Sequence, residues 1–256
     1  MSTALITGAT SGFGRAIALK FAEHGWNVIA TGRRKERLEQ LENEITSTYG
    51  TKVFSLTFDV RNQSEVHDAI HTLPHDWKTI DVLVNNAGLA SGLSPIQDGE
   101  ISDWEIMIDT NLKGLLYVSR EIMHSMVERK KGHIVNIGSI AGKEAYAKGN
   151  VYCATKHAVD AISKSMRIDM LPFGIKVTSI NPGAAETEFS VVRFKGDEHK
   201  AGIVYEGYEP LKAEDIAEVV YFAVSRPAHV VLNDIIITPI AQANTSNLIR
   251  HMHDNN

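Results

Sequence analysis

Residues 4–21, ALITGATSGFGRAIALKF, join a short apolar run, a glycine-rich turn and the start of an amphipathic helix. The glycines are Gly8, Gly12 and Gly14, in the spacing Gly-x-x-x-Gly-x-Gly. Glycine permits a tight turn and lets a phosphate approach the backbone, and the helix that follows offers free N–H groups and a positive dipole end. The stretch therefore predicts a strand, a dinucleotide-binding turn and a helix. The alternative is a glycine-rich turn without a ligand, which the flanking strand and helix argue against.

The rest of the chain repeats this order of short apolar runs and longer helical segments. With 4–7, further strands predicted at 27–31, 52–60, 81–87, 133–139, 175–182 and 234–240 make seven. Helices are predicted at 12–24, 34–48, 102–129, 151–170 and 213–225, with Asn150 capping the fourth and Pro172 and Gly174 stopping it. Strands rich in Val and Ile without polar alternation are typical of burial on both faces. We therefore predict a Rossmann-type, doubly wound, seven-stranded parallel sheet in a single domain, 1–256, with 186–210 as a surface excursion or substrate lid.

Composition and charge restrict the function classes. The chain has 256 residues, of which 43% are hydrophobic and 22% charged, and its net charge of −5 argues against nucleic acid as a partner. The single cysteine, Cys153, excludes an intrachain disulfide and fits a reducing compartment. No apolar run approaches the length of a membrane span, and the N-terminus lacks a signal-peptide pattern. We therefore expect a cytoplasmic protein with no membrane partner.

The end of the second predicted strand indicates which dinucleotide is bound. An acidic residue is usual there in NAD-binding proteins, where it holds the ribose 2′-hydroxyl. No acid lies between Glu23 and Glu36, and Arg33 and Arg34 take its place. A guanidinium fork suits a 2′-phosphate, so we predict NADP(H); the alternative is two arginines that begin a solvated helix. Asp59, at the end of the third strand, is placed to face the adenine or is a plain turn residue.

Polar side chains gather after the fourth and fifth strands, in NNAG (85–88), GSIAG (138–142) and the helix that follows. Ligands of an open α/β sheet bind at the carboxyl ends of its strands, so Ser139, Tyr152 and Lys156 are expected to converge. Lowering the pKa of a phenol from about 10 to about 7 takes about 4 kcal/mol, and an ammonium one helical turn away can supply about that much. We predict that Lys156 activates Tyr152. The alternative is a buried tyrosine beside a lysine that extends to water.

These pieces together resemble the short-chain dehydrogenase/reductase family. TGATSGFG, NNAG, Asn111, Ser139, YCATK and PGAAET occur in the family's order between residues 7 and 187. The resemblance implies that Tyr152 is the acid/base and that Ser139 binds the substrate oxygen. It also implies that Lys156 holds the nicotinamide ribose and that Asn111 supports a water linking Lys156 to solvent. The residues expected to bind NADP(H) are Gly8, Thr10, Ser11, Gly12, Phe13, Gly14, Arg33, Arg34, Asp59, Val60, Asn86, Ala87, Gly88, Tyr152, Lys156, Pro182, Gly183 and Thr187.

Downstream stretches narrow the resemblance to the NADP-dependent 3-hydroxy acid dehydrogenases; they are GSIAGKEAY, NVYCATK, TEFSVVRFKGD and PAHVVLNDIIITPIAQA. That subgroup oxidises serine, L-allo-threonine, 3-hydroxyisobutyrate and related 3-hydroxy acids, and reduces the matching 3-oxo acids and semialdehydes. A substrate carboxylate implies a cation in the pocket. Arg193 is the candidate, with Lys195 second, and two solvated loop charges are the alternative. Ala184 and Ala185 stand where relatives often carry bulkier Leu and Val, which leaves the pocket size open.

Two other functions stay open. A general NADPH-dependent carbonyl or 3-oxoacyl reductase of the same family would share every motif above. A non-catalytic NADP-sensing regulator has the same fold but typically lacks the tyrosine or the lysine. The helices at 102–129 and 151–170 are apolar on more than one face, and the family commonly assembles through them, so a homotetramer is expected.

The remaining side-chain pairs predict no metal or second nucleophile. Cys153 and His157 lack a third, orienting group, which indicates a packed thiol. His67 and His71 lack the adjacent glutamate of zinc proteases, which indicates a solvated helix face. The histidines of HMH, residues 251–253, belong to a terminal tail where metal binding would be adventitious.

Overall fold

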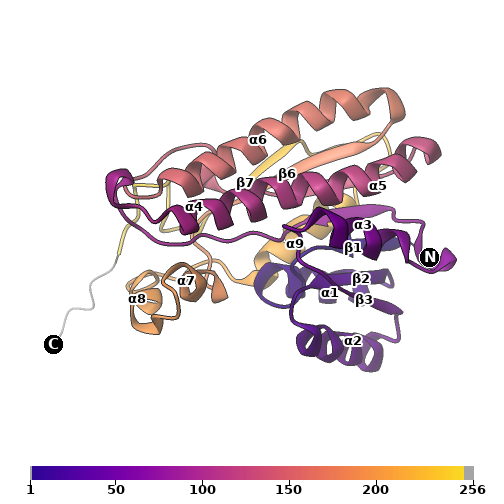
Figure 1. Ribbon diagram of the computed structural model, residues 1–256, viewed down its shortest axis with the longest axis horizontal. Coiled ribbons are helices and arrows are strands. Elements are labelled where there is room, and N and C mark those ends of the chain that lie inside the picture. The colour runs from indigo at the N-terminus through magenta and orange to yellow at the C-terminus, as the bar shows by residue number, and fades with distance from the viewer. Residues whose placement is uncertain (1, 251–256) are drawn as a thin grey trace.

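A computed structural model describes residues 2–250, and the HMH stretch at 251–253 lies outside the described residues. Its centre is a parallel sheet of seven strands in the order β3-β2-β1-β4-β5-β6-β7 (Figure 1). The strands are β1 (Thr3–Ile6), β2 (Asn27–Gly32), β3 (Val53–Thr57), β4 (Val82–Asn85), β5 (His133–Ile137), β6 (Lys176–Pro182) and β7 (Asp234–Ile237). The strand order reverses between β1 and β4, and an open α/β sheet binds its ligands at such a point.

Helices cover both faces of the sheet. They are α1 (Gly12–Glu23), α2 (Lys35–Tyr49), α3 (Gln63–His71), α4 (Ile101–Ile108), α5 (Leu115–Arg129), α6 (Asn150–Met170), α7 (Glu188–Arg193), α8 (Glu198–Ile203) and α9 (Ala213–Val224). Two consecutive residues of β1 point to opposite faces of the sheet. Ile6 packs in the core shared with α1, α2 and α9, and Leu5 packs in the core shared with α3, α5 and α6. Both are fully buried, which explains why the strands read as continuous apolar runs.

The predicted architecture is confirmed, with local differences at element ends. All seven predicted strands form, but the third ends at Thr57 and the fifth at Ile137, so Asp59 and Ser139 lie in the loops beyond the sheet. Helix α3 adds to the predicted set, and the side chain of Asn62 caps it by accepting bonds from the N–H groups of Ser64 and Glu65 at 3.1 and 3.4 Å.

The long helix predicted at 102–129 is interrupted. A π-helical turn, Asp109–Gly114, separates α4 from α5, and it contains Asn111. A Cβ atom at Gly114 would lie 2.7 Å from Cγ2 of Val60, so this turn packs closely against the loop after β3. Single π turns inside α-helices occur frequently at functional sites, and sequence periodicity does not reveal them.

The prediction that Asn150 caps α6 is wrong, because Asn150 is the first residue of the helix and Gly149 precedes it as the cap. Its side-chain amide donates to the carbonyl of Ser94 at 2.9 Å, which ties the start of α6 to the loop before α4. Its Oδ1 accepts from the N–H of the next residue, Val151, at 2.7 Å and not from an N–H two or three residues further along, as a capping side chain would. No helix in the described part of the chain is long and apolar enough to cross a membrane.

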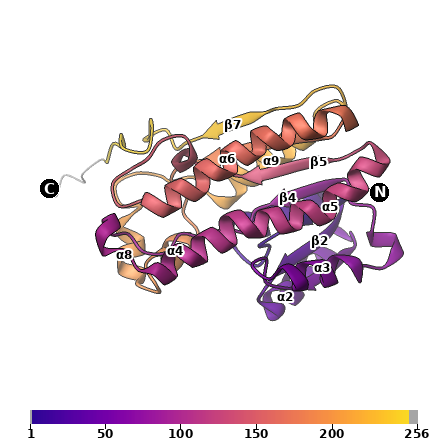
Figure 2. The same ribbon diagram turned by 45° about the horizontal axis from the view of Figure 1, so that its top comes forward.

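The 186–210 segment folds into the short helices α7 and α8. Thr187 caps α7 through the N–H of Phe189 at 3.2 Å. The Tyr205 hydroxyl donates to the carbonyl of Ala185 at 2.8 Å and holds the end of the segment against its beginning. Figure 2 shows β5 and β7 directed toward the end of the molecule where α8 lies. The segment therefore covers the carboxyl ends of the strands.

Candidate active site

A cavity of about 600 Å³ lies at the carboxyl ends of the strands. Almost all the predicted site residues line it: Gly8, Thr10, Ser11, Gly12, Phe13, Arg33, Arg34, Asp59, Val60, Asn86, Ala87, Gly88, Ser139, Tyr152, Lys156, Pro182, Gly183, Thr187 and Arg193. The two exceptions, Gly14 and Asn111, are not among the residues that line the cavity. Lys195, the second choice for a carboxylate partner, is not among the lining residues, and its ammonium pairs with Asp103 at 2.9 Å.

The glycine turn has the geometry that a pyrophosphate needs. Gly8 and Gly12 have φ angles of +68° and +49°, and a Cβ atom at Gly14 would lie 2.3 Å from the carbonyl oxygen of Gly8. A side chain at Gly14 is therefore sterically excluded. Ser11 precedes α1 but makes no side-chain capping bond, so the first N–H groups of this helix have no side-chain cap. These donors, at the positive end of the helix dipole, suit an anionic ligand.

Arg34 is fixed at the edge of this turn. Its guanidinium donates to the hydroxyl of Thr10 through Nε and Nη2, at 3.1 and 2.9 Å, and to the hydroxyl of Ser11 at 2.8 Å. Arg33 is more exposed, and its Nη1 lies 3.7 Å from Asp59. The two arginines therefore differ, and Arg34 is the better placed to hold a 2′-phosphate beside the pyrophosphate turn.

Two residues that the sequence argument missed, Glu188 and Arg37, form an ion-pair cluster with Arg34. Glu188, at the start of α7, pairs with Nη1 of Arg34 at 2.9 Å and also with Arg37. Burial alone would raise the pKa of Glu188, but its bonds to the two arginines hold it below the usual value. Arg34 is the residue before α2, and Arg37, in the first turn of that helix, pairs with the same carboxylate. The cluster thus links α7 to the predicted 2′-phosphate pocket.

Asp59 lines the cavity, but its carboxylate is engaged by the chain itself. Arg61 donates to Oδ2 of Asp59 through Nε and Nη2, at 3.0 and 2.6 Å. Burial would raise the pKa of Asp59, and the bonds from Arg61 outweigh it and keep the pKa low. This pairing favours the alternative that Asp59 is a turn residue. Its contact with an adenine stays a prediction.

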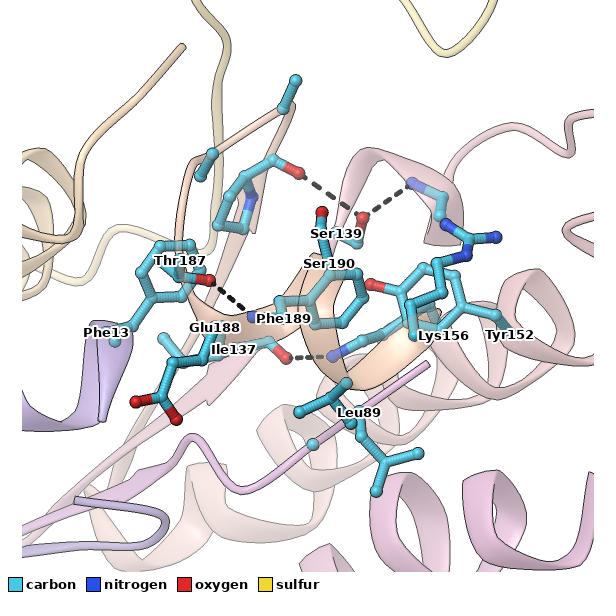
Figure 3. Close-up of a pocket in the computed structure, with 18 of the residues that line it drawn as sticks. Phe13, Leu89, Ile137, Ser139, Tyr152, Lys156, Thr187, Glu188, Phe189 and Ser190 are labelled. Carbon is cyan, nitrogen blue, oxygen red and sulfur yellow. Dashed lines mark hydrogen bonds between the residues drawn. The ribbon is translucent and has the colours of Figure 1, made fainter. Parts of the chain in front are cut away.

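Ser139, Tyr152 and Lys156 converge at the inner end of the cavity (Figure 3). The Ser139 hydroxyl accepts from the N–H of Ala141 at 3.0 Å, which fixes its position after β5. The Lys156 ammonium donates to the carbonyl of Ile137 at 2.9 Å and lies 6.0 Å from the centroid of the Tyr152 ring. The helical spacing thus brings phenol and amine to one site, with the serine from another element beside them.

Burial sets the protonation of this pair. It raises the pKa of the Tyr152 phenol and lowers the pKa of the Lys156 amine to about 8. The chain's own groups therefore leave the pKa of Tyr152 raised, because the same burial that strengthens the attraction to Lys156 also disfavours both charges. Activation of Tyr152 by Lys156 together with a bound cofactor stays a prediction. Near neutral pH the phenol keeps its proton, which is the form that can protonate a substrate oxygen.

Asn111 positions the loop beside Lys156. Its amide donates to the carbonyl of Leu89 at 2.8 Å and to the hydroxyl of Thr155 at 3.1 Å, and its oxygen accepts from the N–H of Leu89 at 2.8 Å. Added at Gly88, a Cβ would lie 3.2 Å from Oδ1 of Asn111 and 3.6 Å from Nζ of Lys156. The π turn therefore places Asn111 near Lys156. That Asn111 supports a water beside Lys156 stays a prediction.

Arg193 lies between two aromatic rings in the cavity. Its guanidinium carbon is 5.5 Å from the ring centroid of Tyr146 and 5.7 Å from that of Tyr152. Nε donates to the carbonyl of Gly92 at 3.4 Å, while the buried Nη2 has no hydrogen-bond partner among the described residues. Tyr146, which sequence reasoning missed, thus helps to hold a guanidinium with an unused donor beside the candidate acid/base.

Comparison with known proteins agrees with this geometry. The profile of the short chain dehydrogenase family matches residues 2–198. The chain belongs to the short-chain dehydrogenase family. It is similar to the NADP-dependent 3-hydroxy acid dehydrogenase YdfG of Salmonella typhi, with 50% identity over 93% of this chain and 95% of that protein. It is also similar to sulfoacetaldehyde reductase 2 of Chromohalobacter salexigens, with 43% identity over 93% of this chain and 94% of that protein.

A solved structure also resembles this dehydrogenase. It is the closed form of serine dehydrogenase complexed with NADP⁺, which is 45% identical and has a TM-score of 0.92, over 98% of this chain and 100% of that one. The predicted family and fold are therefore confirmed, and the protein is an oxidoreductase.

Proposed function

We propose that this short-chain dehydrogenase uses NADP(H) to oxidise the hydroxyl of small 3-hydroxy acids, of the serine, L-allo-threonine and 3-hydroxyisobutyrate class. In the other direction it reduces the matching 3-oxo acids and semialdehydes. The observation that carries this substrate class is Arg193, which lines the cavity and whose buried Nη2 has no hydrogen-bond partner among the described residues. The relative named a 3-hydroxy acid dehydrogenase and the serine dehydrogenase structure support it.

The residues present fit NADP(H). The glycine turn with its uncapped helix start suits the pyrophosphate, and the guanidinium of Arg34, held by Thr10 and Ser11, suits the 2′-phosphate. Lys156, which lines the same cavity, would bond the nicotinamide ribose. When bound, the oxidised cofactor accepts the hydride of the alcohol carbon and brings a positive charge to the site, which favours a phenolate at Tyr152.

The chain's own residues handle the proton. In oxidation, the Tyr152 phenolate takes the proton of the substrate hydroxyl, and in reduction the phenol returns it to the carbonyl oxygen. Ser139 donates a hydrogen bond to that oxygen and so stabilises the negative charge that develops on it. The high pKa of the buried phenol suits the reductive direction, since it keeps Tyr152 protonated at neutral pH.

Arg193 distinguishes acids from neutral alcohols. A buried donor without a partner is unfavourable, and a carboxylate oxygen would satisfy it with a charge-assisted bond. In a 3-hydroxy acid the carboxylate is separated from the carbinol carbon by a single carbon, so it stays close to the reacting group. A sulfonate, which the name of the sulfoacetaldehyde relative implies for that protein's substrate, is an anion of similar placement.

The test compares Arg193→Ala with the control Lys195→Ala on 3-hydroxyisobutyrate and on its uncharged methyl ester. Loss of a hydrogen bond to a charged group is worth about 1.5–3 kcal/mol, so kcat/KM for the acid is expected to fall about 10- to 150-fold in Arg193→Ala. The kcat/KM for the ester is expected to change little in Arg193→Ala. In the Lys195→Ala control, kcat/KM is expected to stay near the wild-type value for both substrates. An equal loss on acid and ester would remove the carboxylate role.

The rival function, a general carbonyl or 3-oxoacyl reductase, predicts a different preference. Such an enzyme would reduce neutral ketones or thioesters better than 3-oxo acids. A panel of these substrates with NADPH separates the two, and higher kcat/KM on the neutral compounds would favour the rival. Turnover of any of them excludes a regulator that only binds NADP(H).

We further infer a homotetramer assembled through α5 and α6. Three large apolar side chains on or directly after these helices, Leu116, Ile168 and Leu171, are 40, 72 and 74% exposed. Large apolar side chains exposed on an outer helix layer are suited to burial in subunit contacts. Sedimentation of the purified protein tests this, and a monomer at micromolar concentration would contradict it.

A further inference from the structure

A nearly buried carboxylate lies between two histidines on the outer layer of helices. Glu121, on α5, has a side chain only 8% exposed, and its Oε2 is 3.4 Å from Nδ1 of His67 and 3.8 Å from Nδ1 of His71. The two histidines are one turn apart on α3, and their rings lie with centroids 3.9 Å apart. The prediction of a purely solvated helix face at His67 and His71 overlooked this third group, which comes from another helix.

The three side chains have the composition of a transition-metal site. Imidazole nitrogen and carboxylate oxygen are common zinc ligands, bound at about 2.0–2.2 Å. One candidate ligand atom from each residue lies within 4.8 Å of the others. Tetrahedral ligands at such bond lengths are about 3.3–3.4 Å apart, so the Glu121–His67 pair already has the required separation. The histidine side chains are 52 and 57% exposed, so an ion can reach both rings from solvent.

The contacts around the cluster leave a lone pair on each group. Arg120 pairs with Oε1 of Glu121 at 3.2 Å, which leaves Oε2 directed at the histidines. Nδ1 of His71 lies 2.9 Å from the carbonyl oxygen of His67. A ring N–H bonded to a carbonyl is the usual arrangement of a metal-binding histidine, because it fixes the other ring nitrogen as the ligand.

We propose that His67, His71 and Glu121 bind one Zn²⁺ ion, with the fourth position open to water. The ion would link α3, a helix of nine residues, to the longer α5. None of the three residues lines the cavity of the active site, so the ion acts on the packing of these helices and not on the reaction. Figure 2 shows α3 beside α5, away from α8.

The test uses the full chain without an affinity tag and with His251→Ala and His253→Ala as the background, because those histidines could bind zinc on their own. Zinc is titrated by calorimetry, and cobalt absorption reports the coordination geometry. Stoichiometric binding of one ion per chain is expected, and Glu121→Gln, His67→Gln and His71→Gln are each expected to weaken it at least 10-fold. His75→Gln, an exposed histidine outside the cluster, is the matched control.

A second readout separates binding from folding. In the background protein the thermal midpoint is expected to rise with zinc concentration, and the rise is expected to disappear in Glu121→Gln, whose midpoint without zinc stays near that of its parent. Zinc binding that survives Glu121→Gln would mean an adventitious histidine pair and would overturn the site. The same conclusion follows if no stoichiometric binding occurs.

Discussion

Glu188 is expected to compete with the 2′-phosphate of NADP(H). Its carboxylate bridges Arg34 and Arg37, at the edge of the pyrophosphate turn where the phosphate would bind. A phosphate entering there must displace the carboxylate or tolerate its charge. Removing that charge in Glu188→Gln should therefore strengthen the binding of the phosphorylated cofactor.

The size of the effect follows from exposure. The side chains of Arg34, Arg37 and Glu188 are 41, 43 and 44% exposed, so solvent screens both ion pairs. Exposed pairs contribute about 0.2–1 kcal/mol each, and two of them give about 0.5–2 kcal/mol, or about 2- to 30-fold in the dissociation constant. NADH lacks the phosphate and should bind almost unchanged.

The assay is fluorescence titration of NADPH and NADH against wild type, Glu188→Gln and Glu186→Gln. Glu186 is the matched control, because it is an exposed glutamate of the same segment whose carboxylate does not line the cavity. We expect tighter NADPH binding in Glu188→Gln alone. Unchanged or weaker NADPH binding in that variant would refute the competition and would mean that Glu188 serves to hold Arg34 in place.

Two further predictions concern the cofactor pocket and pH. Arg34→Ala should weaken NADPH binding far more than Arg33→Ala, with little change for NADH in either, and equal losses in titrations of the two variants would contradict the assignment to Arg34. Burial, with Lys176 nearby, lowers the pKa of His133 to about 4, so unfolded His133 takes up a proton near its usual pKa of about 6.5 while the folded form stays neutral. Stability should therefore fall by about 3 kcal/mol between pH 6.5 and pH 4 through this group, and denaturant unfolding of His133→Gln should show a correspondingly flatter acid limb.

The parts of the fold and site that follow from the sequence are local in the chain. The strand, turn and helix around Gly8 and Gly14 are consecutive, and Tyr152 and Lys156 are one turn apart on α6, so periodicity and spacing suffice to place them. Parallel topology then brings the strand ends together, which is why Ser139 could be assigned to the same site as the tyrosine.

The rest depends on contacts between distant segments. Glu188 meets Arg34 across 154 positions of sequence, and Arg193 meets the carbonyl of Gly92 across 101. No local pattern encodes these partners. The pKa values of Tyr152 and Lys156 depend on packing for a related reason, because the sequence predicts the spacing of the two groups but not how deeply they are buried.

The account depends most on Tyr152 as the proton donor and acceptor. The direct measurement is single-turnover reduction of a 3-oxo acid by Tyr152→Phe with bound NADPH, since phenylalanine keeps the buried ring and removes only the hydroxyl. General acid–base catalysis contributes about 10²–10⁴-fold, so the rate should fall by that factor while the dissociation constant of NADPH changes little. A rate within a few-fold of wild type would contradict the proposed mechanism.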